Sequence, residues 1–273
     1  MNTKKTALSL RPRGWKFDLP THHETIKPCP RSKYLRPPPN HYDHIYLELS
    51  RSSLRVRGFS LIFGPPLFLM SIFIEILGLY VAIFKFNQID FEIIAVALSA
   101  MTFLQLLILP TMRMDLELPR DEPIRFNRLR RKVYVYQYKY DHLRVFSRRR
   151  WGVQPKVYDW DDLHAEACSV YLPMGNGGLI ENIIISVRKP GTDEVIDRFF
   201  FSHDWVEGQA YWTIAQLFME QGPQALPDFV HPARDRNNEP TAFDFIPHFA
   251  PAVKWPEKMD LESRSAPSSE EVL

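Results

Sequence analysis

The sequence predicts an α+β membrane protein, in which a two-helix transmembrane hairpin is followed by an antiparallel, β-rich domain with one C-terminal helix. Two apolar stretches, Phe59–Phe84 and Ile93–Met112, each have about the twenty residues that a helix needs to cross the ~30 Å hydrocarbon core of a bilayer. After Met112 the pattern changes to short alternating segments, which are typical of β-strands. A helical period returns once, over Val206–Gln221.

The N-terminal residues 1–42 are rich in proline, with the run Pro37-Pro38-Pro39, so we expect a mobile tail. Residues 43–58 form a basic lead-in to the first apolar stretch. Within this part, Tyr42–Leu49 has the composition of a short strand or an interfacial segment. The first apolar run begins too late in the chain for a removable signal peptide.

The transmembrane hairpin is expected within residues 59–112. Proline is tolerated in the first turn of a helix and disrupts later turns, so Gly64-Pro65-Pro66 predicts that the first regular helix covers about residues 65–86. The second helix covers about residues 91–110, because Pro110 ends or bends it. The connection between them is so short that both ends of the hairpin should lie on one side of the membrane.

Basic residues gather outside the two spans. Residues 1–58 hold twelve Lys/Arg against four Asp/Glu, residues 113–150 hold twelve against five, and the turn between the spans holds one Lys. The positive-inside rule therefore places both termini in the cytoplasm. A basic excess can also indicate nucleic-acid binding, but no helix-turn-helix, zinc-finger or RNA-binding signature accompanies it, so we expect no nucleic-acid partner.

Residues 113–230 are predicted to form the cytoplasmic β-rich domain, and residues 231–273 a second mobile tail. The candidate strands are Ile124–Phe126, Lys132–Tyr138, Leu143–Phe146, Lys156–Trp160, Ala165–Tyr171, Ile180–Arg188 and Val195–Ser202. The helix that follows has Asp204 as a candidate N-cap, with Glu207 in the position of a capping box. A sheet or small barrel followed by one helix is the layout of a pleckstrin-homology-like domain.

Several short motifs in this half of the chain carry a resemblance. They are Ile124-Arg125-Phe126-Asn127-Arg128, Arg131-Lys132-Val133-Tyr134, Asp159-Trp160-Asp161, and Trp212 with Phe218–Pro223 and Leu226-Pro227. Together they resemble a family of uncharacterised bacterial membrane proteins, with a transmembrane hairpin ahead of a pleckstrin-homology-like cytoplasmic domain. The resemblance covers roughly residues 45–228. It implies a bacterial inner-membrane location and an immunity or accessory role beside type VI secretion and toxin genes, and it offers no catalytic residues.

Glu75 is the most unusual residue by position, because a carboxylate in the middle of an apolar span costs several kcal/mol, of the order of 3. Folding the hairpin about residue 88 places Glu75 opposite Thr102, with Ser99 and Gln105 one turn to either side. Three interpretations are open. Glu75 forms an interhelical hydrogen bond as a protonated side chain, contacts another subunit or a partner's transmembrane helix, or belongs to a proton or ion pathway.

Two basic runs are candidates for contact with anionic lipid headgroups, or else only reinforce the topology. The first consists of Arg128, Arg130, Arg131 and Lys132, and the second of Arg148, Arg149 and Arg150. Both are expected at strand ends or turns close to the membrane.

The acidic cluster Asp159-Trp160-Asp161-Asp162 predicts a turn at a strand end. A metal or nuclease site needs carboxylates that converge from several elements, whereas neighbours on a strand point to opposite faces. The segment Gly175-Asn176-Gly177-Gly178 likewise predicts a hairpin turn, because no strand-to-helix context of a phosphate loop surrounds it.

Histidine and cysteine residues could act as metal ligands or as a catalytic nucleophile. His22-His23 with Cys29, and His41 with His44, match no zinc spacing, and His164 near Cys168 lacks a third orienting group. We therefore predict no enzyme activity, no cofactor and no metal. Both cysteines fall on the cytoplasmic side, where a disulfide is not expected.

The sequence thus predicts a non-enzymatic interaction protein that contacts the lipid bilayer. By the resemblance, its protein partner is a toxin or a secretion component, and self-association through the hairpin is open. Two alternatives remain: an anionic-lipid- or signal-sensing protein that uses the β-domain, and a small subunit of a transporter or channel.

Overall fold

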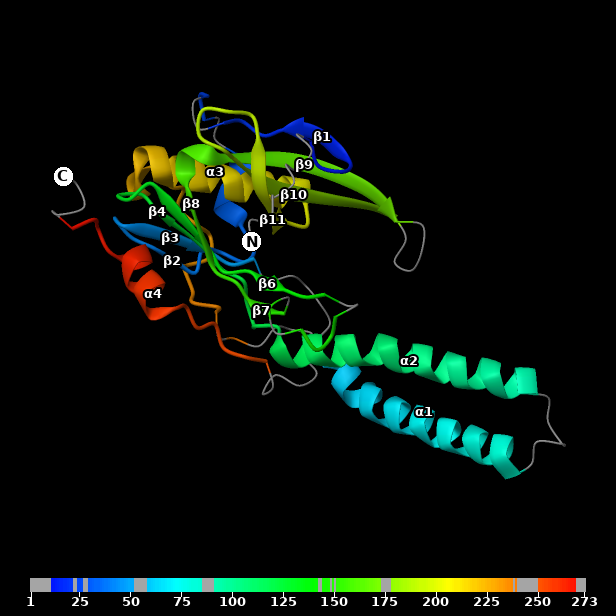
Figure 1. Cartoon of the computed structure of the whole chain (residues 1–273). Coiled ribbons are helices and arrows are strands. Elements are labelled where there is room, and N and C mark those ends of the chain that lie inside the picture. The colour runs from blue at the N-terminus through cyan, green and yellow to red at the C-terminus, as the bar shows by residue number, and fades with distance from the viewer. Residues whose placement is uncertain are drawn as a thin grey trace.

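A long helical hairpin projects from one side of a two-sheet β-domain in the computed structural model of the chain (Figure 1). The structure describes residues 11–21, 24–26, 29–51, 58–84, 91–141, 144–147, 149, 151–172, 178–237, 239 and 250–268.

The hairpin consists of α1, Phe59–Phe84, and α2, Phe91–Glu117, which pack side by side. Both helices are long and apolar enough to cross a membrane. Only 6% and 11% of the residues in their most apolar stretches are buried within the protein. A core helix of a soluble protein has the same composition but is mostly buried, so these helices present their apolar side chains outward.

α1 begins at Phe59 and continues through Pro65 and Pro66, although these prolines led us to expect its start near residue 65. The turns before the prolines are held by other contacts. The N–H groups of residues 61 and 62 donate to the carbonyl of Gly58, and Asp115 of α2 accepts hydrogen bonds from Ser60 N and Oγ at 3.1 and 2.5 Å. Pro110 does not end α2, which continues to Glu117.

The hairpin is inserted between two neighbouring strands of the larger sheet. This antiparallel sheet has the order β2–β3–β4–β5–β8. Its strands are β2 His41–Tyr42, β3 Tyr46–Leu49, β4 Ile124–Asn127, β5 Lys132–Val135 and β8 Lys156–Asp159. β3 precedes α1, β4 follows α2, and the two strands pair from Tyr46 opposite Asn127 to Leu49 opposite Ile124. Most strands follow the helices, as expected, but β1, β2 and β3 precede them, so the hairpin interrupts the β-domain.

Arg51 and Asp121 join the two chain segments that enter and leave the hairpin. Arg51 N donates to Asp121 Oδ1 at 3.1 Å, and the buried Arg51 guanidinium donates to the carbonyls of Glu122, Tyr136 and Phe200 at 2.7, 2.7 and 2.5 Å. Burial raises the pKa of Asp121 to about 6 and lowers the pKa of Arg51. Because Phe200 belongs to the other sheet, Arg51 ties both sheets to the base of the hairpin.

The second sheet has the order β1–β9–β10–β11, again antiparallel. Its strands are β1 Trp15–Asp18, β9 Leu163–Leu172, β10 Gly178–Arg188 and β11 Val195–Ser202, and a separate pair consists of β6 Tyr138–Lys139 and β7 Gly152–Val153. Short 3₁₀ helices are η1 Pro30–Tyr34, η3 Trp160–Asp162 and η4 Pro223–Ala225. Each predicted strand has a counterpart except Leu143–Phe146: its described residues lie in a turn, in which Ser147 N donates to Arg144 O.

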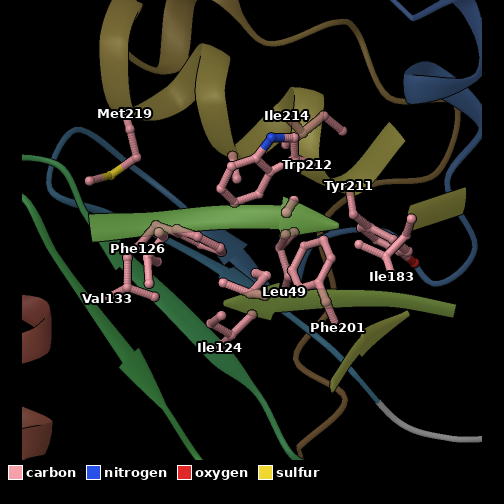
Figure 2. Packing of buried hydrophobic residues seen from close by; sticks show 14 of the residues in the cluster. Leu49, Ile124, Phe126, Val133, Ile183, Phe201, Tyr211, Trp212, Ile214 and Met219 are labelled. Atoms are coloured by element: carbon pink, nitrogen blue, oxygen red, sulfur yellow. The ribbon is translucent and has the colours of Figure 1, made fainter. Parts of the chain in front are cut away.

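The hydrophobic core lies between the inner faces of the two sheets and α3, Trp205–Gln221. Asp204 caps α3 as predicted, because its side chain accepts a 2.8 Å hydrogen bond from Glu207 N. Figure 2 shows α3 side chains, among them Trp212 and Met219, above the side chains of the strands. Trp212 packs on Trp160 with a ring distance of 5.1 Å, and both are almost fully buried. Full burial of each large apolar side chain is worth about 1.5–3 kcal/mol, so this layer accounts for much of the stability of the β-domain.

The outer face of β4 is covered by the C-terminal helix α4, Glu257–Arg264. Arg125 of β4, 1% exposed, forms ion pairs with Glu48 of β3 and with Asp260 of α4. A buried charge is costly unless paired, so these contacts fix α4 on the sheet.

The N-terminal arm also contacts the β-domain. β1 pairs with β9, and the hydroxyl of Tyr211 on α3 donates to the carbonyl of Pro37 at 2.7 Å. Together with α4, these contacts place described parts of both arms on the β-domain, where the composition led us to expect mobile tails.

Candidate functional site: the polar cluster of the helical hairpin

One polar cluster lies between the two apolar helices. Glu75 of α1 faces α2, where its Oε1 lies 3.1 Å from Thr102 Oγ1 and its Oε2 accepts a 2.9 Å hydrogen bond from Gln105 Nε2. Gln105 Nε2 also donates to Ser71 Oγ at 3.1 Å. The structure therefore brings together Glu75, Thr102 and Gln105, three of the four polar residues that the sequence predicts within the spans.

The side chains of this cluster also bond to the backbone of their own helices. Thr102 Oγ1 lies 3.0 Å from the carbonyl of Leu98, and Ser71 Oγ donates to the carbonyl of Phe68 at 2.7 Å. A hydroxyl has a single hydrogen, so Thr102 donates it either to the carbonyl of Leu98 or to the carboxyl oxygen of Glu75. Glu75, Thr102, Gln105 and Ser71 therefore each have a hydrogen-bond partner within the hairpin.

Ser99, the fourth predicted residue, does not join the cluster. It is exposed and donates to the carbonyl of Ala95 on its own helix at 2.8 Å. Ser71 takes its place and is fully buried. Ser71 was not predicted, because a single hydroxyl in an apolar helix commonly bonds to its own backbone.

Small residues on α1 allow the close approach of α2. Gly64, Ser71 and Gly78 recur every seven residues, which keeps them on one face of a helix. A Cβ atom at Gly64 would lie 2.8 Å from Met112, and one at Gly78 would lie 3.2 Å from Leu98. Small residues at such an interface let two helices pack where no hydrophobic effect drives them together. This spacing is the signal that could have located Ser71.

The first basic run lies away from the hairpin. β4 leads from the end of α2 toward α4, so the turn between β4 and β5 lies on the far side of the β-domain from the helices (Figure 1). Two residues of the run form ion pairs: Arg131 with Asp161 and Glu220, and Lys132 with Glu262. The other two donate hydrogen bonds: the Arg130 side chain to the carbonyl of Ser265, and the backbone N–H of Arg128 to the carbonyl of Ile45. The run thus lies at a turn between strands, as expected, but away from the two apolar helices, and its contacts hold the C-terminal residues.

The second basic run is described only at Arg149, which is exposed on the segment between β6 and β7. Arg148 and Arg150 lie outside the described residues.

Comparison with known proteins places the chain in a family. The model of DUF6708, a family of unknown function, matches residues 101–249, which is more than half of the chain. This protein belongs to the DUF6708 family. No curated protein and no solved structure matches the sequence. The DUF6708 match begins within α2, so it includes Thr102 and Gln105 of the polar cluster but not Glu75.

Within the DUF6708 region, the acidic cluster forms a turn. It ends β8 and continues into η3, where Asp161 pairs with Arg131, and buried Trp160 donates from Nε1 to Glu220 at 2.6 Å. Burial raises the pKa of Asp162, and the neighbouring carboxylates add to this shift. Among the described residues there is no group of three or more His, Cys, Asp or Glu side chains that could hold a metal ion.

The thiol of Cys168 lies in an environment that does not activate it as a nucleophile. Burial raises the pKa of Cys168 on β9 to about 11, opposite to the shift that a catalytic thiolate needs. Cys29 and Cys168 are both free thiols. His41 contacts Asp43 at 3.1 Å, and the pair His22-His23 lies outside the described residues.

Proposed function

We propose that this DUF6708 protein is a non-enzymatic interaction protein of the bacterial inner membrane, with its hairpin in the bilayer and its β-domain in the cytoplasm. The observation that carries the proposal is the pair α1 and α2, whose most apolar stretches are only 6% and 11% buried. Two helices with so much exposed apolar surface need an apolar environment, and the hydrocarbon core of a bilayer matches their length.

The position of the hairpin in the sheet supports this topology. Because β3 and β4 are paired neighbours, the chain leaves the β-domain and returns to it at one place. A hairpin with both ends at one place crosses the membrane twice, and the basic residues of the β-domain side favour the cytoplasm.

The strand order supports a pleckstrin-homology-like comparison for the β-domain. In chain order from β3, four strands of the first sheet, β3, β4, β5 and β8, are followed by three strands of the second, β9, β10 and β11, and then by α3. Domains of this layout host many binding functions, so the layout favours an interaction role without naming the partner.

The hairpin offers a surface for a second transmembrane partner. Its polar cluster is satisfied within the protein, and the outward faces of both helices are apolar. This arrangement favours a helix-packing contact over a transport pathway, because two helices that close on each other enclose no pore.

Within this class we propose an immunity or accessory role in toxin delivery by type VI secretion, on the strength of the resemblance of the motifs in residues 45–228. The test is protection of cells that produce the toxin encoded beside this gene. Wild-type protein should restore growth.

A chimera separates the two parts of the molecule. In it, α1 and α2 are replaced by an unrelated apolar hairpin of the same length, so that the β-domain stays at the membrane without the native helices. Protection that survives in the chimera assigns the partner to the β-domain, and protection that is lost assigns it to the hairpin. Failure of the wild-type protein to protect, together with no co-purified membrane partner after cross-linking, would overturn the proposed role.

A further inference from the structure

Between β6 and β7 the structure describes residues 140, 141, 144–147, 149 and 151, which we call the β6–β7 loop, and these residues are fixed to the end of α2 that adjoins the β-domain (Figure 1). Trp151 packs in a small apolar cluster with Leu118, Tyr138 and Met114. The Arg113 guanidinium lies 4.7 Å above the Trp151 ring and donates to the carbonyl of Val145. The loop is therefore held at the level of Arg113 along the hairpin.

Arg113 marks where the apolar stretch of α2 ends. It is the first charged residue after Met112, and Asp115 and Glu117 follow it. In a helix that crosses a membrane, the first charges after the apolar stretch lie at the headgroup level. Trp151 and Val145, which contact Arg113, then lie at the headgroup level too.

The β6–β7 loop presents an apolar side chain to the outside at this level. Phe146 is 86% exposed, more than any other large apolar side chain in the described part of the chain, those of α1 and α2 included. The backbone on both sides of it is held: Trp151 Nε1 donates to the carbonyls of Asp141 and Arg144 at 2.9 and 3.1 Å, and Ser147 N donates to Arg144 O at 3.0 Å. A fixed, outward phenylalanine beside a membrane-crossing helix is what an interfacial anchor requires.

Arginines on the same loop add the charge that anionic lipid attracts. Arg144 and Arg149 are both exposed and form no ion pair with any residue that the structure describes. In this they differ from Arg131 and Lys132, which carboxylates engage on the far side of the β-domain.

We propose that the β6–β7 loop is a membrane-surface anchor, which inserts Phe146 at the interface and binds anionic phospholipid headgroups through Arg144 and Arg149. The inference rests on the proposed membrane location of α1 and α2. The occupant is lipid because the loop continues the apolar surface of the hairpin at its headgroup end. Its effect is to fix the β-domain close to the bilayer, rather than leave it to swing on the two connections at the base of the hairpin.

Fluorescence depth measurement tests this directly. The full chain with Cys29→Ser receives one exposed cysteine, either Phe146→Cys or, as the matched control, Leu261→Cys. Leu261 is 66% exposed on α4, at the opposite end of the β-domain from the hairpin (Figure 1). Each protein is labelled with an environment-sensitive dye and reconstituted into vesicles of neutral phosphatidylcholine, with or without anionic phosphatidylglycerol, that carry spin-labelled lipids at shallow or deep positions.

We expect the label at residue 146 to show blue-shifted emission and at least twofold stronger quenching by shallow than by deep spin labels, and the label at residue 261 to resemble the dye in water. Because each arginine near an anionic surface shifts binding roughly fivefold, Arg144→Glu with Arg149→Glu should lower the quenching in anionic vesicles and leave that in neutral vesicles almost unchanged.

Three results separate the possible failures. A water-like label at residue 146 in a protein that resists carbonate extraction would overturn the anchor and leave the membrane hairpin standing. Extraction of the protein by carbonate would overturn the proposed location itself. Quenching that is equal in neutral and anionic vesicles, and unaffected by the two charge reversals, would refute the headgroup contact.

Discussion

Leu49 and Ile124 lie opposite each other on the paired strands β3 and β4, although the whole helical hairpin separates them in the chain. Both side chains are almost fully buried in the core between the sheets. The sheet thus closes across the base of the hairpin, and the β-domain draws little of its core from α1 and α2. The helices are an insertion into a domain that is complete around them.

Removal of the hairpin should therefore leave a folded, soluble β-domain. We expect a chain in which residues 52–117 are replaced by about six Gly/Ser residues to span the gap between two neighbouring strands and to stay monomeric without detergent. Size-exclusion chromatography and the dispersion of amide signals by NMR measure this. Aggregation of the shortened chain, with loss of its thermal transition, would show that the helices hold the domain together.

The hydrogen-bond pattern at Glu75 predicts opposite results for two substitutions. Glu75→Gln keeps an acceptor for Gln105 and a donor for Thr102, so stability in detergent should change by less than about 0.5 kcal/mol. Glu75→Leu removes one of the two acceptors of the Gln105 amide and should cost roughly 1–2 kcal/mol, which the added change Gln105→Leu should partly restore. Denaturation of the four proteins in mixed micelles gives the comparison. Equal losses for Glu75→Gln and Glu75→Leu would mean that the carboxylate charge itself is needed.

Gly208 tests the contact between α3 and the second sheet. A Cβ at this position would overlap with Ile183 of β10 and lie 2.9 Å from Ser202 Cβ. Helix propensity alone makes Gly→Ala favourable by about 1 kcal/mol, whereas overpacking costs about 1–3 kcal/mol. We expect Gly208→Ala to destabilise by roughly 1–2 kcal/mol in thermal or chemical unfolding. Gln209→Ala, on the exposed face of the same turn, is the control and should stay within about 0.5 kcal/mol; a more stable Gly208→Ala would contradict the close packing.

Asp121 predicts a specific pH dependence at the base of the hairpin. Burial raises its pKa from the usual value near 3.8 to about 6, so the folded protein binds the proton more tightly than the unfolded chain. The free energy of unfolding therefore falls as the pH rises from about 4 to about 6, by roughly 3 kcal/mol from this group. The difference between wild-type protein and Asp121→Asn, unfolded by denaturant in detergent across pH 4–7, isolates the effect. A difference that is constant with pH would refute the raised pKa.

The helices and most strands could be predicted from the sequence because each carries its own period. The two apolar stretches and the alternation in Lys132–Tyr138 can be recognised without tertiary information. Asp204 is an N-cap residue, so it indicates the start of α3. Period alone could not show that the hairpin interrupts a sheet, because the pairing of β3 with β4 depends on residues far apart in the chain.

Charge and composition were less reliable guides than period. Proline in the N-terminal arm suggested a tail, yet the arm supplies β1, which pairs with β9. Arg131 and Lys132 resembled lipid-binding residues in sequence, but carboxylates from Asp161, Glu220 and Glu262 meet them in the fold. At the polar cluster, reflection of the hairpin located Thr102 and Gln105, because helix geometry fixes which residues face each other. Ser71 was not located in this way, because only the residues opposite Glu75 were considered.

The central claim is that α1 and α2 cross the membrane as a hairpin and keep the β-domain in the cytoplasm. The most direct measurement is cysteine labelling of intact spheroplasts with a membrane-impermeant maleimide, on the full chain with Cys29→Ser. We predict that Asn87→Cys, between the two helices, is labelled from outside, and that Leu261→Cys on α4 is labelled only after the membrane is opened. The opposite pattern would contradict this topology. In that case Leu261→Cys would be labelled in intact spheroplasts, or Asn87→Cys would be labelled only after the membrane is opened.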